Sequence, residues 1–160
     1  MEEILGEAQV RTLLRSAGED GLPVDILTTL HTEFGQDSDE AMGEFYFAPN
    51  DNEESQVQYF TSVITLSEEV NKEHLPELYE AISKLNFYLP VGSFAIDEED
   101  SSLAYKHVVP IRVDCSQEEL LQQVDILIAH ALSISEEYIA ILLHVSEGKA
   151  TVQDIIDLFV

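Results

Sequence analysis

The segment that most constrains the fold is the long apolar run of residues 116–147. Ser116 and Glu119 have the spacing of a capping box, in which each side chain binds a free backbone N–H at the start of a helix. We therefore predict one helix that begins at Ser116, runs to about Glu147 and is stopped by Gly148.

The apolar residues of this predicted helix form two lines when they are placed at about 100° per residue. The second line lies about 100° round from the first, so the apolar arc covers about 200°. Covering one sheet requires about half of that arc, so the helix must meet two apolar surfaces. The main line is Leu120, Val124, Leu127, Ala131, Ile134, Tyr138, Ile141 and Val145, and the second is Leu121, Ile128, Leu132, Ile139 and Leu143.

Three elements could cover the second line: a helix near the N-terminus, a short C-terminal helix, or a second subunit. Thr151 can cap the short helix in "VQDIIDLF", but that helix is too small to cover the whole line. We therefore expect a homodimer. The candidate dimer or partner surface is Leu121, Ile128, Leu132, Ile139 and Leu143.

The N-terminal half predicts a helix followed by strands. Residues 3–16 place apolar residues at mixed spacings of three and four, which is typical of an amphipathic helix. Residues 24–34 alternate as a half-buried strand does, although a helix can also be drawn through them. We expect a loop in "GQDSDEAMG" (35–43) and a second strand in "EFYFAP" (44–49).

The middle of the chain predicts a central strand, a helix and a hairpin. "QVQYFTSVITL" (56–66) is β-branched or apolar on both faces, as in a central strand. Residues 73–86 change to a helical period, with Pro76 in the first turn. The hairpin begins near Pro90, where we expect an early strand position, and Gly92 predicts a bulge or a close backbone approach. "DEED" (97–100) is its turn, and "SLAYKHVVPIRV" (102–113) is a strand whose Pro110 predicts an edge or a bulge.

These elements make one α+β domain over residues 1–160, with the short helix at 151–159 as an addition. The expected order is helix, three strands, helix, two strands, long helix and short helix, with a five-stranded antiparallel sheet.

The stretches "QYFTSVITL", "LYEAISKLNFYLPVGSFAID" and "SLAYKHVVPIRV", followed by "SQEELLQQVDILIAHAL", resemble the type III secretion chaperone-like fold. Within that fold they are similar to the YbjN-like group of small acidic bacterial proteins, over roughly residues 24–145. The resemblance implies an antiparallel sheet with helices against it, frequent homodimerisation and a role in holding other proteins. It implies no catalytic residues.

The charge of the chain limits the classes of partner that we expect. Asp and Glu outnumber Lys and Arg by 32 to 7, which gives a net charge of -25. A field of this sign repels phosphate groups, so we expect no nucleic-acid and no anionic-membrane partner. The single cysteine fits a reducing compartment, and the N-terminus lacks the basic region of a secretory signal. The long apolar segment contains Asp125 and Glu136, which do not suit a bilayer span, so we expect a cytoplasmic protein.

The candidates for chemistry are weak. Acidic neighbours of Cys115 favour its neutral thiol, so we predict that it packs on Leu120 as a hydrophobic staple. His130 and His144 are 14 residues apart on one helix, about 21 Å, which is too far to share a metal ion. The acidic loops lack the glycine-centred arrangement of a calcium loop, and Ser93 in "VGSFA" lacks the second glycine of a nucleophile elbow. We expect no catalytic, cofactor or metal site.

We therefore expect a non-enzymatic protein-binding module, chaperone-like or adaptor, that holds a basic or amphipathic segment on a strand edge or apolar groove. The alternative is an acidic immunity-type or inhibitor protein that masks a basic toxin or enzyme.

Overall fold

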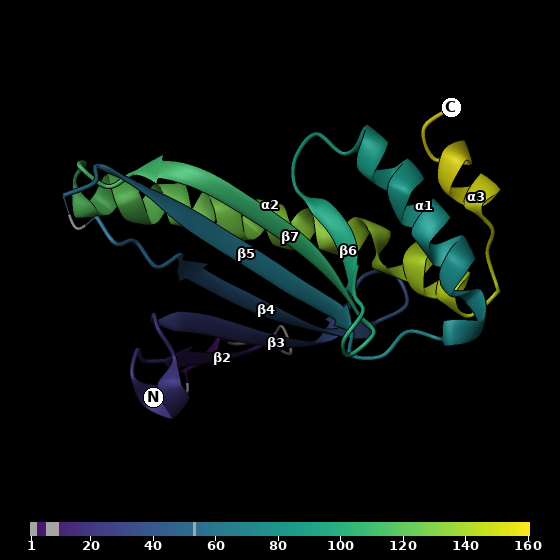
Figure 1. Ribbon diagram of the computed structural model, residues 1–160, viewed down its shortest axis with the longest axis horizontal. Coiled ribbons are helices and arrows are strands. Elements are labelled where there is room, and N and C mark those ends of the chain that lie inside the picture. Colours follow the sequence, from purple (N-terminus) through teal and green to yellow (C-terminus); the bar gives the residue numbers. More distant parts are fainter. Residues whose placement is uncertain (1–2, 6–9, 53) are drawn as a thin grey trace.

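One antiparallel sheet and three α-helices make up the protein (Figure 1). The computed structural model describes residues 3–5, 10–52 and 54–160. The strands are β1 (Glu3–Leu5), β2 (Val10–Arg15), β3 (Ile26–Phe34), β4 (Asp39–Phe47), β5 (Val57–Ser67), β6 (Ser93–Asp97) and β7 (Ser102–Arg112). The helices are α1 (Leu75–Tyr88), α2 (Gln117–Ser146) and α3 (Val152–Asp157), with 3-10 turns η1 (Glu19–Gly21) and η2 (Lys72–His74).

The strand order in the sheet is β1-β2-β3-β4-β5-β7-β6. Six of these strands have five or more residues, and β1 has three. The α+β class and the antiparallel sheet are confirmed, but the sheet is larger than the five strands predicted. Strands β3 to β7 correspond to the predicted five, and β5 lies between β4 and β7 as expected of a central strand.

The helix predicted over residues 3–16 is wrong, because this segment contains β1 and β2; residues 6–9 of the prediction lie outside the described part. All six residues of β2 pair with β3, from Val10 opposite His31 to Arg15 opposite Ile26. The ladder of backbone hydrogen bonds and the packing of Leu14 beside Leu27 outweigh the local helical pattern, which is a weak preference in any short segment.

The loop predicted over residues 35–43 is shorter than expected, because β4 already begins at Asp39. Small residues explain the difference. Ala41 and Gly43 are buried, and a Cβ on Gly43 would lie 2.8 Å from the ring of Phe45. These residues were read as turn-forming, but in β4 they make room for larger neighbours.

The helix-to-hairpin segment follows the prediction with two changes. α1 has Pro76 in its first turn as predicted, and it ends at Tyr88 instead of Asn86. Pro90 lies before β6 and is not a strand residue. Gly92 makes the predicted close approach: its φ is +67°, and a Cβ there would lie 2.1 Å from the hydroxyl of Tyr105.

The edge predicted at Pro110 is confirmed. β6 pairs with β7 only from Ser102 to Lys106, so in the described structure Pro110 has a strand partner on one side only, where it lies opposite Tyr59 of β5. A residue without an N–H suits this position, because no ladder bond is required on the open side.

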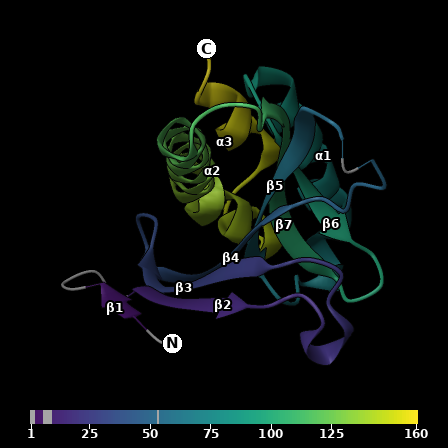
Figure 2. The same ribbon diagram turned by 90° about the vertical axis from the view of Figure 1, so that its left-hand side faces the viewer.

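The long helix is unbroken over 30 residues. Ser116 and Glu119 form the predicted capping box, and Gly148 follows the end of the helix with a φ of +70°. α2 runs along β5 and β7 on one face of the sheet, and its C-terminal half also packs against α1 (Figures 1 and 2). α3 packs on α1, and Tyr88 stacks on Phe159 with a ring distance of 4.5 Å.

Candidate functional site

A row of five residues crosses the sheet face that carries α2 and becomes uncovered at one end. In register, Leu14 of β2 lies beside Leu27 of β3, and the row continues through Phe45, Ser62 and His107. Phe45, Ser62 and His107 are at most 7% exposed, whereas Leu14 is 58% exposed. The apolar floor of the core therefore continues past the helix that covers it.

The second apolar line of α2 shows the same gradient along the helix. Ile139 has no exposed surface, and a Cβ on Gly35, just after β3, would lie 2.4 Å from its Cγ2 atom. Leu132 and Ile128 are half-buried, and Leu121, the first residue of the line, is 55% exposed.

The first gradient ends at Leu14 on the sheet, and the second ends at Leu121 on α2. Ile139 fixes the C-terminal half of α2 against the end of β3, and α2 runs in the same direction as β3 (Figure 1). From Ile139 back to Leu121 the helix rises about 27 Å, and from Gly35 back to Leu27 the strand rises about 26 Å, so Leu121 is level with Leu27. Helix and strand diverge toward that end (Figures 1 and 2). We call these exposed and half-buried apolar residues the α2–β3 surface: Leu14, Leu27, Leu121, Ile128 and Leu132.

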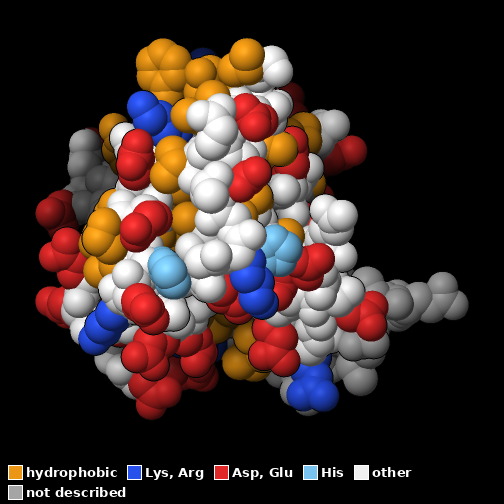
Figure 3. All heavy atoms as spheres, turned by 90° about the vertical axis from the view of Figure 1, so that its right-hand side faces the viewer, with side chains coloured by type: hydrophobic (Ala, Val, Ile, Leu, Met, Phe, Trp, Pro, Cys, Tyr) orange, Lys and Arg blue, Asp and Glu red, His pale blue; other side chains and the backbone are white. Residues whose placement is uncertain are grey.

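Acidic side chains border this surface. On α2, the exposed Glu118 and Asp125 lie about 40–80° round from Leu121 and Ile128, on the side away from the core. Neither α2 nor β3, β4 and β5 contains a Lys or Arg. At the end of the molecule that carries α1 and α3, acidic side chains are more widespread than basic ones (Figure 3). The α2–β3 surface therefore combines an apolar centre with a negative border.

The structure places the five residues predicted for a dimer or partner surface in different environments. Leu121 is exposed, and Ile128 and Leu132 are half-buried. Ile139 is a correction: it is buried inside the protomer, because the turn after β3 packs directly on it. Leu143 is half-buried and lines a pocket with residues of the sheet.

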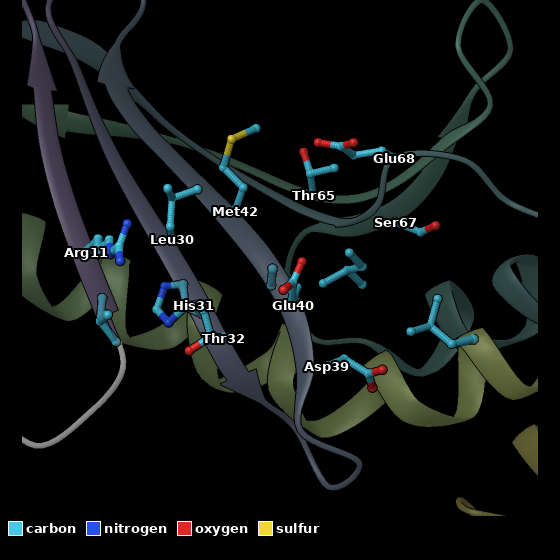
Figure 4. A pocket seen from close by; sticks show the side chains of 14 residues that line it. Arg11, Leu30, His31, Thr32, Asp39, Glu40, Met42, Thr65, Ser67 and Glu68 are labelled. Carbon is cyan, nitrogen blue, oxygen red and sulfur yellow. The ribbon is translucent and has the colours of Figure 1, made fainter.

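That pocket lies at the end of the sheet where β3 ends and β4 begins (Figure 4). Burial shifts the pKa of two of its titratable residues. His31 contacts the Thr29 hydroxyl at 2.9 Å, and burial lowers the pKa of its ring. Burial and the nearby Asp37 raise the pKa of Asp39. Within the described part of the chain, no group of three or more His, Cys, Asp or Glu is arranged to hold a metal ion.

The other residues considered for chemistry, Cys115, His130 and His144, do not form a common site. The Cys115 thiol contacts the Arg112 carbonyl at 3.5 Å and the Gln123 amide at 3.7 Å; its packing on Leu120 stays a prediction. His130 faces His107 of β7 with a ring distance of 6.2 Å, and His144 pairs with Asp37 at 2.8 Å. Because α2 is unbroken, the two helix histidines keep their separation of about 21 Å.

Length and composition alone would allow α2 to cross a membrane. The core helix of a soluble protein passes the same test, and here α2 packs along the sheet.

The sequence did not identify Leu14 and Leu27 as part of the surface. Leu14 was assigned to a helix. Leu27 was assigned to a strand whose neighbouring strands in the sheet were not predicted. Residues 10–15, VRTLLR, do not alternate between apolar and polar side chains, so the local pattern gives no signal for a strand here.

Comparison with models of protein families, with curated proteins and with solved structures gives no match for this chain.

Proposed function

We propose that this protein is a non-enzymatic binding module that holds a basic amphipathic segment of another protein on the α2–β3 surface. The observation that carries the proposal is the exposure of Leu14 and Leu121, at 58% and 55%, on an apolar surface continuous with the core. Fully burying an exposed leucine side chain contributes about 1.5–3 kcal/mol, so burying the exposed half of one of these contributes about 0.8–1.5 kcal/mol.

Charge supports a basic partner. The net charge of -25 attracts a cationic chain from a distance, and Glu118 and Asp125 at the border would face its charged side chains. An amphipathic helix with one apolar face and Lys or Arg beside it matches this arrangement.

The arrangement of elements supports the chaperone-like class. Three strands, a helix, a hairpin and a long helix follow one another from β3 to α2, which is the order expected from the resemblance to the type III secretion chaperone-like and YbjN-like proteins. The β1–β2 hairpin in place of a first helix departs from that pattern. We propose that the protein acts in the cytoplasm.

The second candidate is an acidic inhibitor that masks a basic toxin or enzyme. The absence of Lys and Arg from α2 and from β3 to β5 favours a cationic target in either case. An inhibitor would bind a folded target tightly and one-to-one, with an association rate that falls steeply with salt. A chaperone-like module would bind flexible segments more weakly.

The test uses a labelled 18-residue peptide of Leu and Lys with a helical apolar face, and a scrambled peptide of the same composition. We expect the first peptide to bind at least tenfold more tightly, measured by fluorescence anisotropy. Leu121→Ser should weaken this binding about tenfold, which corresponds to about 1.4 kcal/mol.

Leu158→Ser is the matched control, because Leu158 is 54% exposed at the end of α3, and α3 lies at the other end of the molecule from the first turn of α2 (Figure 1). It should change the affinity less than twofold. Equal binding of the two peptides, or equal effects of the two substitutions, would exclude the α2–β3 surface as the site.

A further inference from the structure

The face of the sheet opposite α2 has several exposed apolar side chains and carries no described helix. In Figure 1 this face is turned toward the viewer. Solvent-facing positions of an antiparallel sheet are usually polar, in alternation with the buried ones. Here Leu30 and Val108 are 45% and 46% exposed, and Tyr59 is 56% exposed. The outward positions of the central strands include Leu30, Met42, Tyr46, Tyr59, Val63 and Val108.

The register shows that these residues form continuous rows. Leu30 lies beside Met42, Met42 beside Thr65 and Thr65 beside Ala104, and the first three project from the same face (Figure 4). A contiguous apolar patch of this kind is uncommon on a soluble monomer and usually marks an interface.

This face is also close to neutral in a strongly acidic chain. The outward positions of its strands carry four of the seven Lys and Arg residues of the chain, and three of its 32 Asp and Glu residues. Arg15 is paired with Glu44, and Arg112 with Asp114. The cations are Arg11, Arg15, Lys106 and Arg112, and the acids are Glu40, Glu44 and Asp97.

We propose that this outer sheet face binds a second copy of the chain, face to face about a two-fold axis. Two molecules of net charge -25 repel each other, and the repulsion is smallest when their near-neutral faces meet and their acidic helix sides point apart. The same patch on both copies closes the assembly as a dimer.

The size of the face fits a stable interface. Strands β2 to β7 have 6, 9, 9, 11, 5 and 11 residues. At about 3.3 Å per residue and about 4.8 Å between strands, they cover about 800 Å². A standard interface buries about 800 Å² per partner. The dimer leaves the α2–β3 surface of each copy free, so it does not depend on the proposed function.

Sedimentation equilibrium over about 10–200 µM protein tests this proposal. We expect dimers whose dissociation constant decreases at least threefold between about 0.05 and 0.5 M NaCl, because salt screens the repulsion between copies. Val108→Glu adds a carboxylate to an exposed outward position of β7, beyond the last β7 residue that pairs with β6, and should weaken the dimer at least tenfold. Leu30→Glu should have the same effect from a different strand.

Ile126→Glu is the control, because it adds the same charge at an exposed position on α2. This variant and Leu121→Ser should dimerise as the unchanged protein does. Circular dichroism checks that each variant is folded. A monomer at 200 µM in 0.5 M NaCl would overturn the proposal. So would a dimer that persists in both sheet variants, or one that Ile126→Glu or Leu121→Ser disrupts.

The two proposals separate in one set of variants. Val108→Glu should abolish the dimer and keep peptide binding, whereas Leu121→Ser should keep the dimer and lose peptide binding. If one of these two expectations is wrong, the proposal behind the other one still stands.

Discussion

His107 is a polar side chain at the centre of the core. It is 7% exposed, its Nδ1 atom is buried without a hydrogen-bond partner, and its ring lies between those of Tyr105 and His130. Burial lowers the pKa of His107, and the nearby His130 lowers it further. The packing of α2 on β7 therefore favours a neutral ring.

This arrangement makes stability depend on pH. The unfolded chain binds a proton at His107 near pH 6.5, whereas the folded protein binds it only at lower pH. The stabilising contribution is complete above pH 6.5 and is lost as the pH falls from there toward the folded pKa. Because a leucine at this position cannot titrate, His107→Leu should gain stability relative to the unchanged protein between pH 7.5 and 5.5, measured by urea unfolding. Parallel curves for the two proteins would show that His107 is not the responsible group.

At the scale of elements, α2 depends on its first turn. The Ser116 hydroxyl accepts a hydrogen bond from the Glu119 N–H at 3.2 Å, and the Glu119 carboxylate accepts one from the Ser116 N–H at 2.9 Å. The Ser116 N–H and the Ser116 hydroxyl both donate to the Glu119 carboxylate, and these two bonds lower the pKa of Glu119. They fix the end of the helix that carries the exposed Leu121.

Removing this cap should loosen the end of α2 and lower overall stability. Ser116→Ala should lower the free energy of unfolding by about 0.5–2 kcal/mol, because it leaves a helix N–H without its partner. Urea unfolding gives this value, and hydrogen exchange should be faster in the first turns of α2 than in its C-terminal half. Thr151→Ala at the cap of the much shorter α3 is a useful comparison. Uniformly faster exchange along α2 would mean that the cap does not act locally.

The elements that sequence could predict are those whose signals are local. The capping box, Gly148 and the unbroken apolar period locate α2, and the change of period at residues 73–86 locates α1 to within two residues. β2 could not be predicted in the same way, because its stability comes from pairing with β3. The sequence of residues 10–15 does not show which strand they pair with.

The candidate surface was predictable only in part, for the same reason. Helical spacing gives the line through Leu121 and Ile139, but it cannot tell which end of the line is covered. That depends on the turn at Gly35, which packs on Ile139 and leaves Leu121 exposed. The contribution of Leu14 also requires the strand order.

At the scale of the whole molecule, charge and shape divide the surface into two sides. The outer sheet face is nearly neutral, whereas α2 contains no Lys or Arg and carries acids along its exposed side. Since most of the net charge of -25 is carried by the remaining surface, like charges there repel one another within one compact body.

This repulsion predicts that salt stabilises the folded protein. The Debye length falls from about 30 Å at 0.01 M to about 3 Å at 1 M ionic strength, so salt weakens repulsion in the compact state more than in the expanded chain. Between about 0.01 and 0.5 M NaCl we expect Tm to rise by at least about 2–4 °C, the shift that 1 kcal/mol produces in a domain of this size.

The experiment must separate this effect from dimerisation, because a dimer also raises Tm by mass action. Val108→Glu is the suitable protein, since we expect it to remain monomeric. Its Tm should rise with salt to the same extent at about 2 and 50 µM protein, and KCl should act as NaCl does. If the Tm of this variant stays constant or falls as salt is added, repulsion among the acids does not limit stability, and the charge must then be explained by partners or solubility alone.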